Sequence, residues 1–325
     1  VTAHLSGDIT VHEGIFVSVD DATYSITSGN IFMDNAALTL SAGGNISFNN
    51  TTDTWLQNIS GDLSSLTLNA YNASEISLDL TGETITINDT ISLEAHNSAN
   101  VYLVANIDGS DFSKISVEAS NYGYVGAHLS GDISAENIYI NAESEAFVEI
   151  SIDQINLTGN IELYASGSDL SGDYSISSLD IQSLSGSLDH ITQSAEDGGV
   201  STLHANGSIS VNDVHLYASG DDYYGGISGV HLEGNLDATL QDFTLEAYGG
   251  AAVSVDLGNL YLGNLSISNN LTLIANGRSE DAMGSHESTI KLTANIDGSS
   301  LDQIHVVGGE YGNVNVDLTG NITLD

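Results

Sequence analysis

The sequence contains no cysteine and no proline among its 325 residues. Without cysteine, neither a disulfide bond nor a thiolate metal site can form. An average chain of this length would carry about 16 prolines. Because proline cannot donate a backbone hydrogen bond to a β-ladder, its absence favours a chain whose strands pair on both sides.

Basic residues are nearly absent as well. Lys114, Arg278 and Lys291 stand against 44 acidic residues, which gives a net charge of −41 and an isoelectric point near 4.1. Contacts with phosphate groups require a basic surface, so the composition excludes nucleic acid as a partner and disfavours an anionic membrane. Such a charge attracts divalent cations, or requires high salt to screen the self-repulsion.

The sequence has no apolar run of 18 residues, so we expect no transmembrane helix. Its first residues show neither a basic region nor an apolar stretch, so no signal peptide is expected in the printed sequence. Hydrophobic residues make up 41% of the chain, aromatic residues only 6%, and there are 34 glycines. This composition suits a narrow interior filled by small and β-branched side chains.

One short phrase recurs along the chain, in which apolar residues alternate with polar ones and an alanine follows. Its alanines lie 25, 24, 23 and 23 residues apart, at Ala70, Ala95, Ala119, Ala142 and Ala165. A fixed period in this range marks stacked supersecondary units, and the alternation is that of a strand. Each repeat therefore predicts one coil of a β-solenoid.

A second phrase, apolar-(Ser/Thr)-Gly-(Asp/Asn)-apolar, interleaves with the first. Its clearest copies contain Gly7, Gly61, Gly131, Gly159 and Gly320. Glycine followed by Asp or Asn allows the positive φ angles of a tight corner. The two phrases together predict an all-β fold, a single-stranded parallel β-helix of about 12 to 13 coils of roughly 25 residues, with three strands per coil.

The array is expected to be one continuous β-solenoid over residues 1–325. Two interruptions break the period, a polar run at Asp189–Asp197 and a longer segment at Asn276–His286, which we expect to loop out of the wall. Residues 320–325, Gly-Asn-Ile-Thr-Leu-Asp, match residues 7–12, Gly-Asp-Ile-Thr-Val-His. With no polar cap at either end, this match suggests a window of a longer rod, or a subunit that stacks into a filament.

Acidic loops offer the hard oxygen ligands that calcium prefers. The candidates are Asp108, Asp111, Asp221 and Asp222; turn chemistry and solvation explain the same residues equally well. The ten histidines show no HExxH or paired-ligand spacing. His4 and His128, which share a repeat position, are therefore expected to be outward strand residues.

Parallel β-helices also include enzymes that cleave polysaccharides with pairs of carboxylates. Lyases acting on acidic sugars need basic groups to hold the substrate, and this chain has three. We therefore expect no enzyme, although some pair among 44 acids can fall within the spacing of a glycosidase. Several tyrosines, among them Tyr71 and Tyr248, gather where loops are expected. Their side chains either stack on sugars or on a neighbouring rod, or cover bends.

The acidic, lysine-poor and cysteine-free composition, the Gly-Asn and Gly-Asp corners and the alternating Ile, Leu and Val resemble the β-solenoid stalks of bacterial surface adhesins and exoproteins. These are proteins of the filamentous haemagglutinin and autotransporter kind. The resemblance implies this architecture and a cell-surface location, and no functional residues. The expected function is an extracellular structural role, as a self-associating rod or filament subunit for adhesion, a sheath or a biofilm matrix. A carbohydrate-binding or carbohydrate-cleaving β-helix is the alternative.

Overall fold

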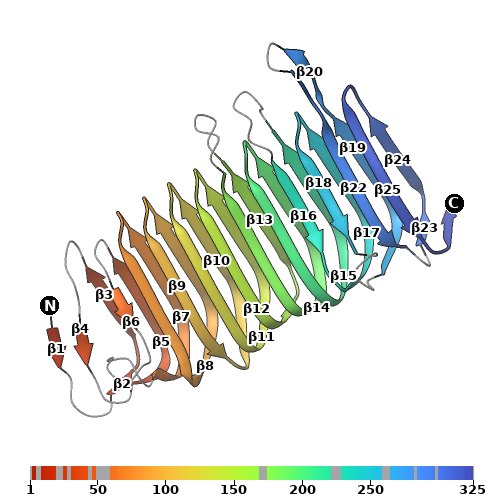
Figure 1. Ribbon diagram of the computed structural model, residues 1–325. Helices are drawn as coiled ribbons and strands as arrows, with labels where there is room; N and C mark the ends of the chain where they lie inside the picture. Colours follow the sequence, from red (N-terminus) through yellow and green to blue (C-terminus); the bar gives the residue numbers. More distant parts are fainter. Residues whose placement is uncertain are drawn as a thin grey trace. The chain divides into compact units, whose positions relative to one another are not determined.

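The computed structural model describes residues 2–4, 9–19, 25–27, 31–42, 46–48, 59–167, 174–220, 228–257, 264–281, 284–296 and 299–324. These residues form strands and turns and contain no helix (Figure 1). The strands are β1 (Thr2–His4), β2 (Ile9–Val11), β3 (Gly14–Val19), β4 (Ser25–Thr27), β5 (Ile31–Ala42), β6 (Ile46–Phe48), β7 (Ile59–Tyr71), β8 (Glu75–His96), β9 (Asn100–Ile107), β10 (Ser110–Ser120), β11 (Tyr124–Glu143), β12 (Phe147–Leu157), β13 (Asn160–Ser166), β14 (Ile176–Glu196), β15 (Val200–Ser219), β16 (Gly229–Glu233), β17 (Leu236–Tyr248), β18 (Ala252–Asp256), β19 (Leu265–Asn276), β20 (Arg278–Asp281), β21 (Gly284–His286), β22 (Ser288–Asn295), β23 (Ser299–Leu301), β24 (Gln303–Gly308), β25 (Gly312–Thr319) and β26 (Ile322–Leu324).

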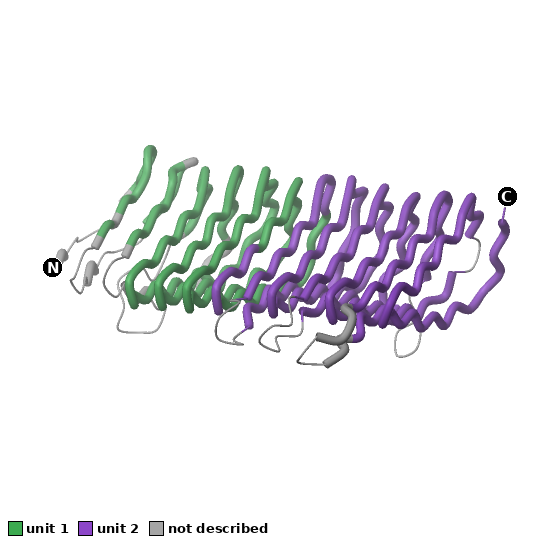
Figure 2. The backbone as a smooth tube through the Cα atoms, turned by 90° about the horizontal axis from the view of Figure 1, so that it is seen from above, with its two compact units in different colours: residues 1–140, 146–156 green, residues 141–145, 157–325 purple. Residues whose placement is uncertain are grey.

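Over the described residues the fold is the expected parallel β-solenoid, with coils about 24 residues apart in about ten turns. This number is smaller than the 12 to 13 coils expected from the sequence. The chain divides into two compact units, Val1–Ile140 with Ala146–Asn156, and Asn141–Glu145 with Leu157–Asp325 (Figure 2). The two units are described separately below.

In unit 1, the first residue of each phrase pairs in register with the same residue of the next coil. Parallel ladders join β3 to β5, β5 to β7, β7 to β8 and β8 to β10. The aligned residues are Ile15, Leu38, Leu66, Ile91 and Ile115. The alanines at 70, 95 and 119 consequently stack on one another, as their spacing predicts.

Unit 2 follows the same rule through β13, β14, β15, β17, β19 and β24. The aligned residues are Ile161, Ile191, Val214, Phe243, Leu271 and Ile304. A single long strand supplies all three sides of a coil, since β14 pairs with β15 in three segments, Ile176–Ile181, Leu184–Leu188 and His190–Glu196. Three strands per coil are therefore confirmed.

The prediction that the polar run at Asp189–Asp197 interrupts the array is wrong for most of that run. Residues 189–196 belong to β14, and Ala195 pairs with both Ala165 and Ala218. The run is a copy of the phrase in which Gln193 replaces an aliphatic residue. The extra length of this coil lies between the end of β13 at Ser166 and the start of β14 at Ile176.

The second interruption, within Asn276–His286, lies outside the parallel wall, as expected. There β20 and β21 form an antiparallel hairpin in which Arg278 pairs with His286 and Asp281 with Gly284.

The interior of each unit is lined by aliphatic side chains from all three sides of the coil. The inward residues expected from the alternation are buried in both units, for example Val101 and Leu103 in unit 1 and Val253 and Val255 in unit 2. The largest fully buried side chains include Phe112, Phe243 and Met33. Burying a Leu, Ile or Phe side chain contributes about 1.5 to 3 kcal/mol, so this core is the main stabilising term.

Two kinds of turn occur among the described coils. Of the glycine corners quoted from the sequence, Gly61, Gly131 and Gly320 have positive φ angles, as predicted (+95°, +101° and +107°), whereas Gly159 does not, and Gly7 lies outside the described residues. The second kind was not predicted: two successive residues without glycine adopt left-handed conformations, at Asn72–Ala73, Asn97–Ser98 and Asn121–Tyr122. Their asparagine amides form a ladder, because Asn97 Nδ2 donates to Asn72 Oδ1 (3.4 Å) and Asn121 Nδ2 donates to Asn97 Oδ1 (3.3 Å).

Buried serines accept hydrogen bonds from backbone amides at these turns, Ser74 within its own turn and Ser228 at a turn of an adjacent coil. Ser74 Oγ accepts a hydrogen bond from the Tyr71 amide at 2.9 Å, and Ser228 Oγ accepts one from the Gly198 amide at 3.0 Å. Both serines are buried. Buried polar groups need such partners, so these serines are part of the turn and are not free for chemistry.

Gln193 is the one long polar side chain among the fully buried residues of the described chain. It aligns with Leu163 and Leu216 of the adjacent coils. Its Nε2 donates to Ser201 Oγ and to the His231 carbonyl, both at 3.3 Å, whereas its Oε1 has no partner among the described residues.

Replacing Gln193 by leucine is expected to stabilise the protein by about 1 to 2 kcal/mol, because it removes an unsatisfied buried acceptor and restores the aliphatic stack. The midpoint of guanidinium unfolding measures this change. Thr192→Leu, at the adjacent outward position, is the control and should change the midpoint little. A lower midpoint for Gln193→Leu would show that the bonds to Ser201 and His231 outweigh the unsatisfied oxygen.

Candidate functional site

The strands that carry the repeated alternating phrase, such as β7 and β8 in unit 1 and β15 and β17 in unit 2, bear titratable side chains at their outward positions. These side chains contact one another between adjacent coils. Because side chains alternate across a strand, each coil contributes the residues between its aliphatic positions to this face. In both units the face combines tyrosine, glutamate and histidine.

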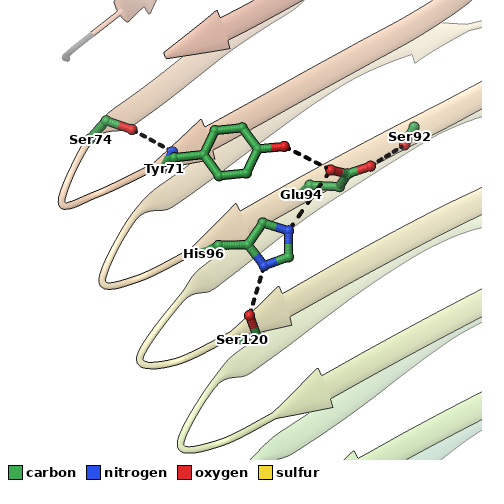
Figure 3. Close-up of polar contacts among 6 residues, drawn as sticks. All are labelled: Tyr71, Ser74, Ser92, Glu94, His96 and Ser120. Atoms are coloured by element: carbon green, nitrogen blue, oxygen red, sulfur yellow. Dashed lines mark hydrogen bonds and ion pairs between the residues drawn. The ribbon is translucent and has the colours of Figure 1, made fainter. Parts of the chain in front are cut away.

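In unit 1 the carboxylate of Glu94 on β8 is the centre of this group, which we call the Tyr71 cluster (Figure 3). Tyr71 Oη donates to Glu94 Oε2 at 3.2 Å, and His96 Nε2 lies 3.8 Å from the same oxygen. The His96 ring stacks on the Tyr71 ring, with centroids 5.4 Å apart and planes at 19°. Ser92 Oγ donates to Glu94 Oε1 (3.4 Å), and His96 Nδ1 bonds to Ser120 Oγ (2.7 Å).

In unit 2 the carboxylate of Glu246 on β17 takes the same part, in what we call the Tyr248 cluster. His215 Nε2 lies 3.0 Å from Glu246 Oε2, and Tyr248 Oη donates to Glu246 Oε1 at 3.3 Å. The ring of Tyr217 lies 5.9 Å from that of Tyr248 and 6.4 Å from that of His215. Each unit therefore holds one carboxylate between a tyrosine hydroxyl and an imidazole.

The two tyrosine hydroxyls of these clusters are held in the protonated state. Partial burial raises the pKa of Tyr71 above its usual value of 10, and the charge of Glu94 and its hydrogen bond add to the effect. Burial and the charge of Glu246 raise the pKa of Tyr248 in the same way. Both hydroxyls consequently act as donors to their carboxylates at neutral pH.

A further tyrosine and carboxylate pair lies on another side of unit 1, on β11 and β12. Tyr124 Oη donates to Glu149 Oε2 at 2.8 Å, and the ring of Tyr102 lies 5.3 Å from that of Tyr124. Burial raises the pKa of Tyr124 to about 12, with smaller contributions from the hydrogen bond and charge of Glu149. On the same strands, His128 lies 3.9 Å from Asp153, so His128 faces outward as predicted.

Replacing Glu149 by glutamine is expected to lower the pKa of Tyr124 from about 12 while leaving it above 10, because burial, the largest cause, remains. Since the folded pKa exceeds the unfolded value of 10, the stabilisation is complete below pH 10 and is lost as pH rises through about 12. Phenolate absorbance, measured as the difference from Tyr124→Phe, follows this titration. Asp153→Asn is the matched control on the same strand; an unchanged pKa in Glu149→Gln would assign the whole shift to burial.

Other histidines pair with acids in the neighbouring coil. Nδ1 of His204 lies 2.8 Å from Asp180 Oδ1, and Nδ1 of His12 lies 2.8 Å from Asp34 Oδ2. His231 behaves differently, because burial lowers its pKa while the charge of Glu233 acts in the opposite direction. Of His4, the structure describes the backbone alone.

The aspartates proposed for calcium are only partly described. Asp108 and Asp111 are exposed, and the contacts of Asp108 run through its backbone, to the Ile85 carbonyl and the Thr86 hydroxyl. Asp221 and Asp222 lie outside the described residues. Calcium takes six to eight oxygen ligands, whereas no three His, Cys, Asp or Glu side chains gather in the described part of the chain. Calcium binding stays a prediction.

The two clusters offer hydrogen-bonding groups and ring edges on an outward face. Glycoside hydrolysis uses two carboxylates, about 5 to 10 Å apart, and the next coil aligns Glu118 on β10 with Glu94. The geometry of the two clusters can hold adjacent coils together and can bind hydroxyl groups.

Over the described residues, no helix has the length and apolar character needed to cross a membrane. The chain matches no protein-family model, no curated protein and no solved structure.

Proposed function

We propose that the protein is an extracellular structural protein, a scaffold of stacked coils that serves adhesion, a sheath or a biofilm matrix. One observation carries the proposal: within each unit, coil after coil is joined by parallel ladders in register around a continuous aliphatic interior. The clearest example is the alignment in unit 2 of one aliphatic or aromatic residue from each of six stacked strands, β13, β14, β15, β17, β19 and β24, from Ile161 to Ile304.

Such a construction stabilises the folded array coil by coil. In a repeat array, stability is approximately the sum of the stability of each coil and of its contacts with its neighbours. The contacts of the Tyr71 and Tyr248 clusters also join one coil to the next, since Tyr71 bonds to Glu94 and His215 to Glu246. The net charge of −41 keeps such a protein soluble.

The location is supported by the pattern of composition shared with bacterial surface stalks. Antibodies raised against the purified chain test it on intact cells of the source strain. The proposal expects surface labelling without permeabilisation, in fibres or a continuous layer. Labelling that requires permeabilisation would contradict an extracellular role.

Carbohydrate binding is the second candidate, and the repetition of the Tyr–Glu–His combination in both units favours it. Carboxylates accept hydrogen bonds from sugar hydroxyls, and aromatic rings can stack on sugars. A glycan panel tests this function, with the double variant Glu94→Gln and Glu246→Gln against Asp180→Asn as control. A carbohydrate that binds the wild type and the control but not the double variant supports it, whereas an absence of binding across the panel argues against it.

A further inference from the structure

The chain has few chemical means of joining its coils covalently. It contains no cysteine, so disulfide bonds cannot form, and it offers only two lysine side chains for an amide cross-link. It contains 14 tyrosines, against two methionines and one tryptophan. Tyrosine is therefore the most abundant side chain that a one-electron oxidant readily converts to a radical, and two neighbouring tyrosyl radicals couple into a dityrosine.

Tyr102 on β9 and Tyr124 on β11 lie side by side on the outward face of two adjacent coils of unit 1. In the ladder between these strands, Tyr102 aligns with Gly126 and Tyr124 with Asn100. The two ring centroids are 5.3 Å apart, and the ring planes meet at 40°. Tyr102 is 39% exposed and Tyr124 is partly exposed, so a small oxidant can reach both rings.

Gly126 allows the two rings to approach each other. Neighbouring strands lie about 4.8 Å apart, so a side chain at position 126 would lie directly beside Tyr102. An added Cβ there would be 2.9 Å from Tyr124 Cε1 and 3.0 Å from Tyr124 Oη, because the Tyr124 ring occupies this space. Cε1 is one of the two ring carbons next to the hydroxyl-bearing carbon, and tyrosyl radicals couple at these carbons. The glycine therefore brings a reactive ring edge toward Tyr102.

Glu149 on β12 is placed to accept the proton that Tyr124 releases on oxidation. Tyr124 Oη donates to Glu149 Oε2 at 2.8 Å. Because burial raises the pKa of Tyr124 to about 12, its hydroxyl is protonated at neutral pH and must lose a proton as the ring loses an electron. A carboxylate in hydrogen-bond contact accepts that proton directly. The more exposed Tyr102 releases its proton to solvent.

We propose that Tyr102 and Tyr124 are the site of an intramolecular dityrosine cross-link, formed by a haem peroxidase with hydrogen peroxide as the oxidant. Each tyrosine gives up one electron and its phenolic proton, and the two radicals form one carbon–carbon bond between ring carbons next to the hydroxyls. The two ring hydrogens then move to the phenolic oxygens and restore the hydroxyls. One hydrogen peroxide takes up the two electrons and two protons and becomes two water molecules.

The cross-link would join β9 to β11 and hold two adjacent coils of unit 1 together. In this respect the proposal rests on the structural function proposed above, since it names a covalent bond that strengthens the scaffold. A bond of this kind restricts the unfolded chain in the same way as a disulfide does, by closing the loop between residues 102 and 124.

Peroxidase treatment of the purified 325-residue chain, followed by denaturation and digestion with trypsin, tests the proposal. At high dilution, coupling of rings already held side by side is faster than coupling between molecules. Trypsin cleaves after Lys114, Arg278 and Lys291, so Tyr102 falls in fragment 1–114 and Tyr124 in fragment 115–278. The two fragments should remain joined on a denaturing gel. Mass spectrometry after further digestion at acidic residues should find one linked pair of peptides that contains both tyrosines and lacks two hydrogens.

The Tyr217 and Tyr248 rings, with centroids 5.9 Å apart, form a second neighbouring pair, but both residues lie in fragment 115–278. A bond between them therefore does not join the two fragments. Tyr102→Phe and Tyr124→Phe should each reduce the joined product at least about tenfold, since phenylalanine keeps the ring but forms no phenoxyl radical. Tyr71→Phe is the matched control in unit 1, because the Tyr71 ring stacks on His96, and it should leave the joined product unchanged.

Glu149→Gln should slow the formation of the joined product, because an amide is a much weaker base than a carboxylate. An unchanged rate would overturn the part assigned to Glu149. Absence of the joined product in the wild type, or its persistence in Tyr102→Phe and Tyr124→Phe, would overturn the cross-link site itself. Surface labelling of intact cells is independent of these outcomes, so the structural function is tested separately.

Discussion

Replacing Gly131 by alanine is expected to destabilise unit 1 by about 3 to 5 kcal/mol. Gly131 closes a corner with φ at +101°, a conformation that residues with a side chain rarely adopt. An added Cβ would overlap the carbonyl oxygen of Ile107 and would lie 2.7 Å from its carbonyl carbon. That carbonyl belongs to the backbone of the adjacent coil, so relief requires a shift of the wall itself. Guanidinium unfolding followed by circular dichroism measures the loss.

Gly109 provides the matched control, because it also has a positive φ, +65°, but an added Cβ there meets no atom within 4 Å. Gly109→Ala should cost only the left-handed backbone penalty, about 1 to 2 kcal/mol. An equal loss of unfolding free energy in the two variants would show that the backbone at Ile107 shifts to accommodate the added Cβ. Steric overlap would then not be the cause of the destabilisation.

The stacking of the coils could be predicted from the sequence because it depends on local chemistry repeated at a fixed period. Alternation of aliphatic and polar residues specifies which side chains enter the core, and the spacing of Ala70, Ala95 and Ala119 specifies the register. A glycine before Asp or Asn indicates a positive φ, as found at Gly61 and Gly131. Each of these signals lies within a few residues of the feature it predicts.

The second turn could not be predicted in this way. Asparagine tolerates a left-handed conformation, so Asn72, Asn97 and Asn121 gave a weak signal. The residues after them, such as Ala73 and Tyr122, do not favour it. Their conformation is stabilised by the next coil, since the Ala73 amide donates to the Asn97 carbonyl at 2.9 Å. Contacts of this kind exist only after the coils have stacked.

The candidate site, too, could be predicted only in part from the sequence. Tyr71 and Tyr248 were expected in loops, yet both end strands on the outward face. Adding one period to Tyr71 leads to His96, so the Tyr71 cluster could have been found from the sequence. The same arithmetic fails for the Tyr248 cluster, because Tyr217 aligns with Glu246 in the next coil, 29 residues later, and not with a residue one 24-residue period away. Inserted residues change the spacing without changing the register.

Replacing Phe243 by alanine is expected to destabilise unit 2 by about 3 to 5 kcal/mol. Phe243 on β17 is buried and is stacked between Val214 on β15 and Leu271 on β19. Truncation removes a large apolar surface and leaves a cavity that two fixed ladders prevent from closing. Phe243→Leu, a residue of the size found in the neighbouring coils, should cost much less. Thr244→Ala, at the adjacent outward position, should cost little.

The place where the loss appears is as informative as its size. In a stack, each coil contacts only its neighbours, so a cavity at Phe243 weakens the coils on either side directly. Amide hydrogen exchange is expected to accelerate most in β15, β17 and β19, and least in β13, which aligns two coils before β15. Equal acceleration in β13 would mean that unit 2 opens as one cooperative body. In that case its stability could not be divided among coils, and the nearest-neighbour description that supports a persistent scaffold would fail.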